Sequence, residues 1–189
     1  IEPWDAFITT KSINEGSADI SVNTVISSDA ECDIALKLTA IDSIGRAVCN
    51  LEKSLSVTAG KNNEEFTLTI ENPNLWDTEN PYIYTLKAEI STGGEITDTA
   101  EYTFGIRTVS ATFDDGFMLN GKPMKLRGGC IHHDHAGLGS ADFPASFHRK
   151  LSLLKKAGFN ALRSSHNPPS LNVLEECDRL GILLMDEAF

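Results

Sequence analysis

The sequence lacks any apolar run close to the roughly 18 residues that cross a membrane as a helix. Basic residues are also scarce, since 16 Lys and Arg stand against 27 Asp and Glu and give a formal net charge of −11. A protein that binds nucleic acid would need a basic face. We therefore expect neither a membrane nor a nucleic acid among the partners of this protein.

Cysteine is rare as well. The four cysteines are scattered and form no C-x-x-C pair: Cys32, Cys49, Cys130 and Cys177. Buried free thiols are the simplest interpretation. A bridge between Cys32 and Cys49 stays open if the two residues lie in facing strands. The chain begins at Ile1 without Met, so the lack of a signal peptide decides nothing about its compartment.

Residues 1–108 alternate apolar with polar side chains and are rich in Val, Ile, Thr, Tyr and Phe, as half-buried strands are. Several short strands in about 100 residues predict an antiparallel β-sandwich of immunoglobulin type. The expected strands are 18–26, 33–41, 66–70, 82–90 and 99–106. This stretch holds 18 acidic and 7 basic residues, whereas residues 109–189 hold 9 of each, so we expect two units.

Tryptophan occurs only twice, at Trp4 and Trp76. Trp76 lies between two expected strands, where a Trp is more often a core or interdomain plug than a ring that stacks on a ligand. We expect Trp4 to pack in the linker that enters the sandwich.

Residues 109–189 have a different periodicity. Asn120-Gly121 predicts the tight turn of a hairpin over 117–126. After it we expect a strand over 125–131, a helix over 143–157, a strand over 159–165, a helix that opens at 168–170, and a strand over 182–189. The inward residues of the second helix are expected to be Leu171, Leu174, Cys177 and Leu180 or their neighbours.

This β-α-β-α-β order, with the continuous apolar strand ILLM, is typical of parallel strands covered by helices. Three such strands leave an open sheet edge. We therefore expect an incomplete (β/α)8 barrel, with the first three strands of a longer domain. Its exposed apolar faces leave a homo-oligomer open.

The stretch CIHHDH, residues 130–135, gathers residue types that commonly bind zinc. If it is a strand, His133 and His135 share one face. A closed zinc site needs four ligands, commonly in two separated pairs, and no second pair follows at a suitable spacing, so we expect no metal site. Structural histidines and a rim that binds a ligand both stay open, since the cluster follows the first barrel strand at the mouth where barrel sites form.

Several segments resemble the family 2 glycoside hydrolases, the group of β-galactosidases, β-glucuronidases and β-mannosidases. In the order of that family they are LWDTENPYIYTL (75–86), FGIRTV (104–109), FMLNGKPMKLRGG (117–129), HHDH (132–135), FNALRSSHNPP (159–169) and CDRLGILLMDEAF (177–189). The resemblance covers essentially the whole chain. It implies an immunoglobulin-like domain over 1–108 and the first part of a TIM-barrel catalytic domain over 109–189, within a longer protein.

The resemblance implies a parent enzyme that is a retaining exo-glycosidase acting on terminal β-linked sugars, most similar to a β-galactosidase. Retaining hydrolysis needs two carboxylates roughly 5–5.5 Å apart. The family carries its acid/base and nucleophile glutamates on later barrel strands, and neither matching motif is present. We therefore expect no catalytic residue and no cofactor in this chain. A Mg²⁺ ion in the full-length enzyme stays open, as do the sugar, the linkage and the choice between bacterial cytoplasm and periplasm.

The resemblance also implies a substrate-binding role for residues that follow the first two barrel strands. His133 is the best match to the substrate-contacting histidine of the family, with His132 as a rival, and His135 is assigned to the same rim.

In RSSHNPP, His166 and Asn167 are expected to bind the substrate, and Arg163 is expected to orient the catalytic glutamates. Asp186 and Glu187 are neighbours on an expected strand and would point to opposite faces, so they cannot flank one glycosidic bond. A scaffold role, such as pairing with Arg163, is expected for this pair. The alternative function is a non-catalytic β-sandwich module that binds carbohydrate or protein.

Overall fold

The structure, a computed structural model, describes residues 6–188 and divides the chain into two compact units. The first unit holds the residues up to Asn74 together with Tyr82–Thr108, and the second holds Leu75–Pro81 and Val109–Phe189. Trp4 lies outside the described residues.

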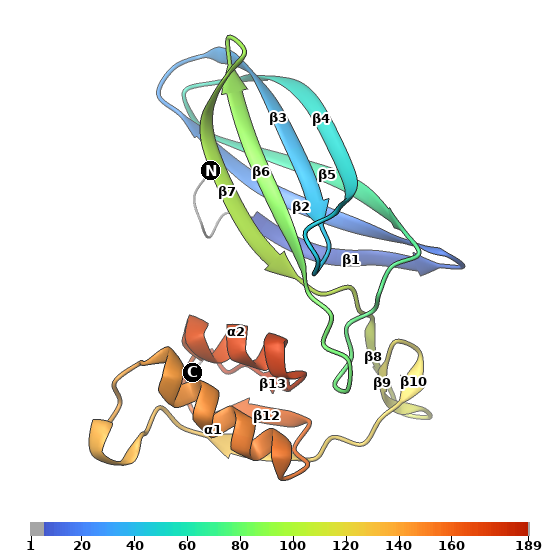
Figure 1. The fold of residues 1–189 in the computed structure, drawn as a ribbon, viewed down its shortest axis with the longest axis vertical. Helices are drawn as coiled ribbons and strands as arrows, with labels where there is room; N and C mark the ends of the chain where they lie inside the picture. The colour runs from blue at the N-terminus through green and yellow to red at the C-terminus, as the bar shows by residue number, and fades with distance from the viewer. Residues whose placement is uncertain (1–5, 189) are drawn as a thin grey trace. The chain divides into compact units, whose positions relative to one another are not determined.

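The first unit is the expected antiparallel β-sandwich (Figure 1). One sheet has the strand order β1-β2-β5, and the other has the order β4-β3-β6-β7. Ile20 and Leu68 from one sheet and Leu86 from the other line one buried gap, so the two sheets bury their inner faces against each other. The strands are β1 (Ala6–Asn14), β2 (Ser17–Ser28), β3 (Cys32–Ile41), β4 (Ala47–Val57), β5 (Gly60–Glu71), β6 (Tyr84–Thr92) and β7 (Glu95–Phe104).

Two strands of this unit, β1 and β4, were not singled out by the alternation of the sequence. Both lie at the edge of a sheet, and β4 is exposed or half-buried everywhere except Val57. In β1, Phe7 is exposed whereas Thr10 and Ser12 are half-buried, so apolar and polar residues do not alternate clearly.

The cysteines of the sandwich do not form the bridge that was left open. Cys49 pairs with Ala40 in the β3–β4 register, whereas Cys32 pairs with Val57 at the far end of the same ladder. All four cysteines of the chain are free thiols.

The second unit begins with the expected hairpin. Strands β8 (Val109–Thr112), β9 (Gly116–Leu119) and β10 (Lys122–Pro123) form a small antiparallel sheet. Asn120 and Gly121 have φ angles of 51° and 70°, the positive values that this tight turn requires.

A parallel sheet with two helices follows, in the expected β-α-β-α-β order (Figure 1). Strands β11, β12 and β13 pair in parallel in that order. They are shorter than the sequence suggested, because turns and loops take up the residues around them. The elements are β11 (Gly128–Ile131), a short 3-10 helix η1 (Ala136–Leu138), α1 (Pro144–Lys156), β12 (Ala161–Ser164), α2 (Leu171–Leu180) and β13 (Leu183–Met185).

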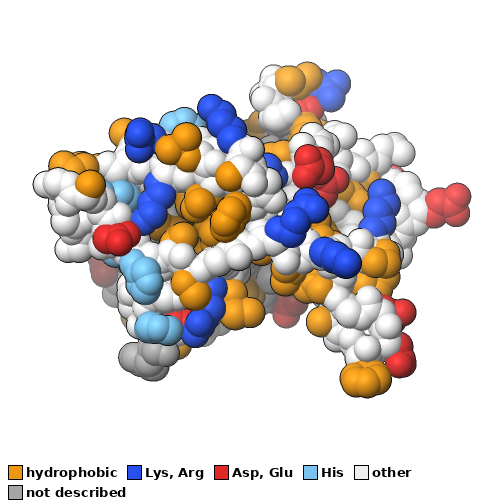
Figure 2. Space-filling model, turned by 90° about the horizontal axis from the view of Figure 1, so that it is seen from below, with side chains coloured by type: hydrophobic (Ala, Val, Ile, Leu, Met, Phe, Trp, Pro, Cys, Tyr) orange, Lys and Arg blue, Asp and Glu red, His pale blue; other side chains and the backbone are white. Residues whose placement is uncertain are grey.

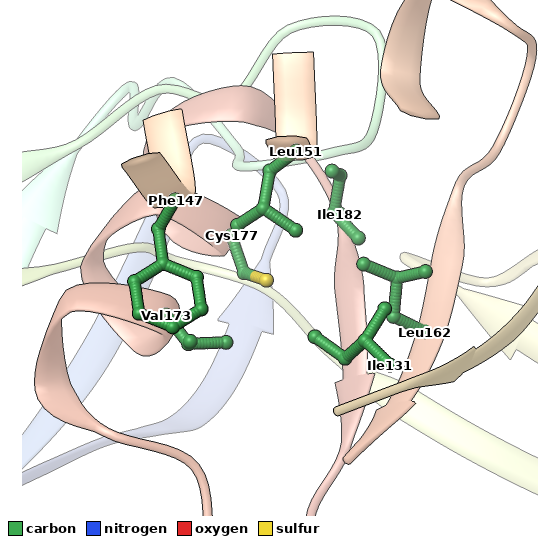
Figure 3. Close-up of a cluster of buried hydrophobic side chains, with 7 residues drawn as sticks. All are labelled: Ile131, Phe147, Leu151, Leu162, Val173, Cys177 and Ile182. Atoms are coloured by element: carbon green, nitrogen blue, oxygen red, sulfur yellow. The ribbon is translucent and has the colours of Figure 1, made fainter. Parts of the chain in front are cut away.

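Seven buried side chains join this sheet to the two helices (Figure 3): Ile131, Phe147, Leu151, Leu162, Val173, Cys177 and Ile182. The inward face of α1 consists of Phe147, Leu151 and the partly buried Leu154, which repeat at helical spacing. On α2, however, Leu171 and Leu174 are exposed. The buried stripe of α2 runs through Val173, Cys177 and the partly buried Leu180, which is also a helical spacing but is turned to a different side.

The segment Leu75–Pro81 belongs to the second unit, although it lies between β5 and β6 in the sequence. Trp76 is only 1% exposed, and its indole N–H donates to the carbonyl of Asp178 at 2.7 Å. The ammonium group of Lys155 donates to the carbonyl of Thr78 in the same segment. Trp76 is therefore a buried plug, as expected, and not a ring that is free to stack on a sugar.

The pairing of β11 with β12 predicts a strong effect of Gly128→Ala. A Cβ atom at position 128 would lie 1.8 Å from the carbonyl oxygen of Ala161, its partner in the register. Overpacking usually costs about 1–3 kcal/mol, and backbone cannot yield as a side chain does, so we expect a loss of about 3 kcal/mol or more. Hydrogen exchange at the amides of β11 and β12 measures this loss.

Gly137→Ala is the matched control, because a Cβ atom there meets nothing within 4 Å. Its effect should stay within about 0.5 kcal/mol. Equal protection of β11 and β12 in the two variants would contradict the strand pairing described above.

Candidate functional site

The candidate site lies where the three parallel strands end. The register places Cys130 beside Arg163 and Arg163 beside Met185. The segments that follow β11, β12 and β13 therefore leave the sheet at the same edge, which is the edge where barrel enzymes build their active sites. Residues 132–135 follow β11, residues 165–170 follow β12, and Glu187 follows β13.

Glu187 connects two of the expected site residues. Its Oε1 accepts a hydrogen bond from Nε of Arg163 at 2.5 Å and also pairs with Nη2 of that guanidinium. Its Oε2 lies 3.0 Å from Nδ1 of His166. The expected pairing of this segment with Arg163 is confirmed, whereas the contact with His166 was not expected from the sequence. One carboxylate thus holds both an arginine and a histidine.

Charge and burial work in opposite directions on this carboxylate. The side chain of Glu187 is only 14% exposed, and burial alone would raise its pKa. The hydrogen bonds from Arg163 and His166 and the positive charge of Arg163 outweigh burial and hold the pKa of Glu187 below its usual value. The hydrogen bond with Glu187 in turn raises the pKa of Arg163. Glu187 therefore stays ionised and is an acceptor rather than a proton donor.

The 132–135 loop differs from the expected strand. β11 ends at Ile131, so strict alternation of side chains does not apply to the histidines. The chain turns because the amide of Asp134 donates to the carbonyl of His132 at 2.8 Å and the amide of His135 donates to Gly139 at 2.8 Å. The directions of the four side chains of this loop therefore follow from turns and local contacts, and not from the alternation of a strand.

His133 is joined to the segment after β12. Its Nδ1 lies 3.1 Å from Nδ2 of Asn167, and its Nε2 accepts a hydrogen bond from the amide of Ser170 at 3.2 Å. Ser170 precedes the first residue of α2, so His133 satisfies one of the amides that a helix start leaves without a partner. The structure thus brings together two expected site residues, His133 and Asn167.

The other two histidines of the loop turn to different neighbours. The ring of His135 packs edge-on against Phe147 with centroids 4.4 Å apart, close to the core of the second unit. The ring of His132 is exposed and lies 6.4 Å from the ring of His166, in an edge-on arrangement. His132 therefore lies beside the Glu187 cluster. Whether His132 or His133 contacts a substrate stays a prediction, as does the role assigned to His135.

Cys130 is exposed, Cys32 and Cys49 are half-buried, and only Cys177 is buried, which corrects the expectation of four buried thiols. Its sulfur accepts a hydrogen bond from Nη1 of Arg163 at 3.7 Å. The Ser165 hydroxyl and the Arg163 guanidinium beside it lower the pKa of this thiol, because both stabilise the thiolate. Cys177 is the opposite case, since burial raises its pKa to about 12.

A hollow of about 680 Å³ lies along the edge of β11 that has no strand partner among residues 6–188. Its floor is apolar and includes Ile131, Leu154 and Phe159, while Cys130, His132, Asp134 and His135 of the candidate site also line it. Figure 2 shows hydrophobic side chains gathered in a hollow with Lys and Arg side chains beside them. The apolar floor suits a packed structural element better than a polar sugar, so the hollow borders the site along the 132–135 loop.

Within residues 6–188, no group of three or more His, Cys, Asp or Glu side chains is arranged to hold a metal ion. In the same range, none of the helices has both the length and the apolar character that a membrane crossing demands.

Comparison with known families assigns both units. The model of "Glycosyl hydrolases family 2" matches residues 1–107, and the model of "Glycosyl hydrolases family 2, TIM barrel domain" matches residues 111–189. The chain belongs to glycosyl hydrolase family 2. The parallel β11–β12–β13 sheet is accordingly the beginning of a TIM barrel.

Curated relatives of this family carry two activities. The chain is 38% identical over 190 residues to the β-galactosidase BoGH2A of Bacteroides ovatus, and this match covers 98% of the chain and 22% of the relative. It is 31% identical to a β-glucuronidase of Formosa agariphila, with 98% of the chain and 19% of the relative covered. The chain therefore spans about a fifth of the length of these relatives.

Solved structures agree with the fold. A family 2 member from Bacteroides cellulosilyticus superposes with a TM-score of 0.96 at 38% identity, over 100% of this chain and 26% of that one. A β-glucuronidase of the same family superposes with a TM-score of 0.91 at 29% identity, over 97% and 20% of the two chains.

The environments of the cysteines predict their order of reaction with a thiol reagent. Cys130 should be alkylated first by iodoacetamide near pH 8, because it is exposed and its lowered pKa gives more thiolate. Cys177 should react last, since it is buried and protonated. Mass spectrometry of peptides after short labelling gives the order. Faster labelling of Cys32 or Cys49 than of Cys130 would contradict the site geometry.

Proposed function

We propose that this chain is part of a retaining glycosidase that removes terminal β-linked sugars, with a β-galactoside as the preferred substrate. The observation that carries the proposal is the cluster of Arg163, His166 and Glu187 at the carboxyl end of a family 2 barrel sheet. The preference for galactose rests on the name of the Bacteroides ovatus relative. The β-glucuronidases among the relatives make the glucuronide the competing substrate.

The proposed role of His166 follows from its partner. An ionised Glu187 accepts a hydrogen bond, so Nδ1 of a neutral His166 carries the proton and Nε2 is an acceptor. Nε2 would then receive a hydrogen bond from a sugar hydroxyl. His132, His133 and Asn167 would add polar groups at the same rim, and His135 would support them from the side of Phe147.

The proposed role of Arg163 is electrostatic. Its guanidinium is half-exposed and is held by Glu187, so it presents a fixed positive charge toward the space above the sheet. Such a charge would orient the two catalytic carboxylates of the family, which need a separation of roughly 5–5.5 Å for retention. This chain carries neither of the matching glutamate motifs. It would bind and orient, while bond cleavage would depend on other parts of the parent protein.

The Mg²⁺ ion of the full-length enzyme stays a prediction. Residues 6–188 offer no group of three metal ligands that would fit it, so we assign the ion no step here.

The test is the full-length parent protein on a panel of nitrophenyl glycosides. We expect hydrolysis of the β-galactoside in preference to the β-glucuronide. His166→Ala and Glu187→Gln should each lower kcat/KM by about 10²-fold, the scale on which misplacement of a reacting group acts. The isolated 189-residue chain should show no hydrolysis above background.

His148→Ala is the matched control, because His148 also contacts a glutamate, Glu176, but does so between α1 and α2. It should keep the activity of the wild type. If no β-glycoside of the panel is hydrolysed, the alternative of a non-catalytic module that binds carbohydrate or protein replaces the proposal.

Self-association is the proposed state of the isolated chain. Leu153, Leu171 and Met185 of the second unit are exposed, and the outer edges of β11 and β13 have no strand partner among the described residues. Such surfaces favour pairing between copies. Sedimentation velocity at micromolar concentration should show dimers or larger species. A monomer at every concentration would contradict this proposal.

A further inference from the structure

Lys150 is placed beneath the 132–135 loop. It lies in the middle of α1, and its ammonium group donates three hydrogen bonds. The acceptors are the carbonyl oxygen of His132 at 2.9 Å, the carbonyl oxygen of Asp134 at 3.0 Å and the carboxylate Oδ1 of Asp134 at 2.8 Å. An ammonium group has three N–H donors, so Lys150 uses all of them on this one loop.

The two carbonyl contacts of Lys150 contribute more to holding the 132–135 loop than its ion pair with Asp134 does. The side chain of Asp134 is 72% exposed, whereas that of Lys150 is only 26% exposed. Exposed ion pairs contribute little to stability. The hydrogen bond and the charge of Lys150 nevertheless keep the pKa of Asp134 below its usual value, so the pair persists at neutral pH.

Each carbonyl contact fixes a peptide plane. The carbonyl of His132 belongs to the peptide that leads into His133, and the carbonyl of Asp134 belongs to the peptide that leads into His135. Lys150 therefore fixes the backbone on both sides of His133 and Asp134. Because β11 ends at Ile131, no sheet ladder fixes these planes. Lys150 adds to the two backbone hydrogen bonds of the turn, from the amide of Asp134 to His132 and from the amide of His135 to Gly139.

The fixed backbone determines where the histidine side chains of the 132–135 loop lie. With its backbone fixed from below, the loop presents the ring of His132 beside that of His166 and joins His133 to Asn167. A loop that could move by about 1 Å would lose this alignment, and such displacements can cost about 10²-fold in rate.

We propose that Lys150 is a positioning residue of the glycoside site, acting through the 132–135 loop without touching the sugar. This inference rests on the proposed glycosidase function for its effect on catalysis, but its effect on the loop is independent of that function.

The experiment compares four variants of the full-length protein. Lys150→Met removes all three hydrogen bonds, Lys150→Arg keeps a charged donor, and Asp134→Asn removes only the ion pair. Lys156→Met is the matched control, because Lys156 is an exposed lysine in the last turn of the same helix. Each variant is measured for kcat and KM on the best nitrophenyl glycoside, for Tm, and for hydrogen exchange at residues 132–139.

We expect Lys150→Met to lower kcat/KM by about 10²-fold, as a displaced contact residue would. Its Tm should stay close to that of Lys156→Met, and its faster exchange should be confined to residues 132–139. Lys150→Arg should recover most of the activity, and Asp134→Asn should lose little. Lys156→Met should match the wild type.

Three outcomes overturn the inference. The first is equal kcat/KM for Lys150→Met and Lys156→Met. The second is a loss in Lys150→Met that comes with a general fall in Tm and faster exchange throughout the second unit, since that is a purely structural role. The third is unchanged exchange of residues 132–139.

If the wild type hydrolyses no glycoside, this result contradicts the proposed function and not the role of Lys150 in the loop. In that event, the exchange of residues 132–139 still tests whether Lys150 holds the loop. Faster exchange in Lys150→Met than in Lys156→Met supports this role, and equal exchange in these two variants overturns it.

Discussion

The parallel pairing of β11, β12 and β13 is the constraint on which the candidate site depends. Strands of three or four residues contribute few hydrogen bonds, yet their register places Cys130, Arg163 and Met185 side by side. Everything that follows the strands then leaves the sheet at one edge. The close approach of Gly128 to Ala161 belongs to the same pairing, since only glycine fits there. Without this register, Glu187 would not meet residues 24 and 21 positions earlier in the chain.

Glu187 connects the side chains that meet at this edge of the sheet. A single carboxylate that is largely shielded from water holds a guanidinium with one oxygen and an imidazole with the other. The charge of the carboxylate sets the tautomer of a neutral His166 and fixes the direction of Arg163. The rim on the other side is fixed by different means, since Lys150 holds the 132–135 loop from below and His133 joins it to the start of α2. A charged residue thus takes part in holding each side of the site, Glu187 on one and Lys150 on the other.

Much of the fold could be predicted from the sequence, because hydrophobic periodicity reports which side chains are buried. The five strands that were named all lie in the sandwich, and the alternation of strands and helices after residue 109 was correct. The strands β1 and β4 escaped prediction, since neither buries a clearly alternating set of apolar side chains. The buried stripe of α2 was not predicted to the residue either, because Leu171, Leu174 and Cys177 fit a helical period as well as Val173 and Cys177 do. Only the position of the sheet decides between the two stripes.

The site was harder to predict than the fold. Arg163 and Glu187 could be paired because a family motif and a strand end pointed to both. The contact of Glu187 with His166 and the role of Lys150 depend on loop geometry, and an ordinary lysine on an amphipathic helix gives no signal in the sequence. The position of each histidine also depended on β11 ending at Ile131, which periodicity does not define to the residue. A crystal structure of the full-length protein with a bound β-galactoside is the most direct test of the central claim. The account predicts a sugar hydroxyl within about 2.6–3.2 Å of the His166 ring, with Glu187 still paired to Arg163. A sugar bound away from His166, or a Glu187 that points away from both partners, would contradict it.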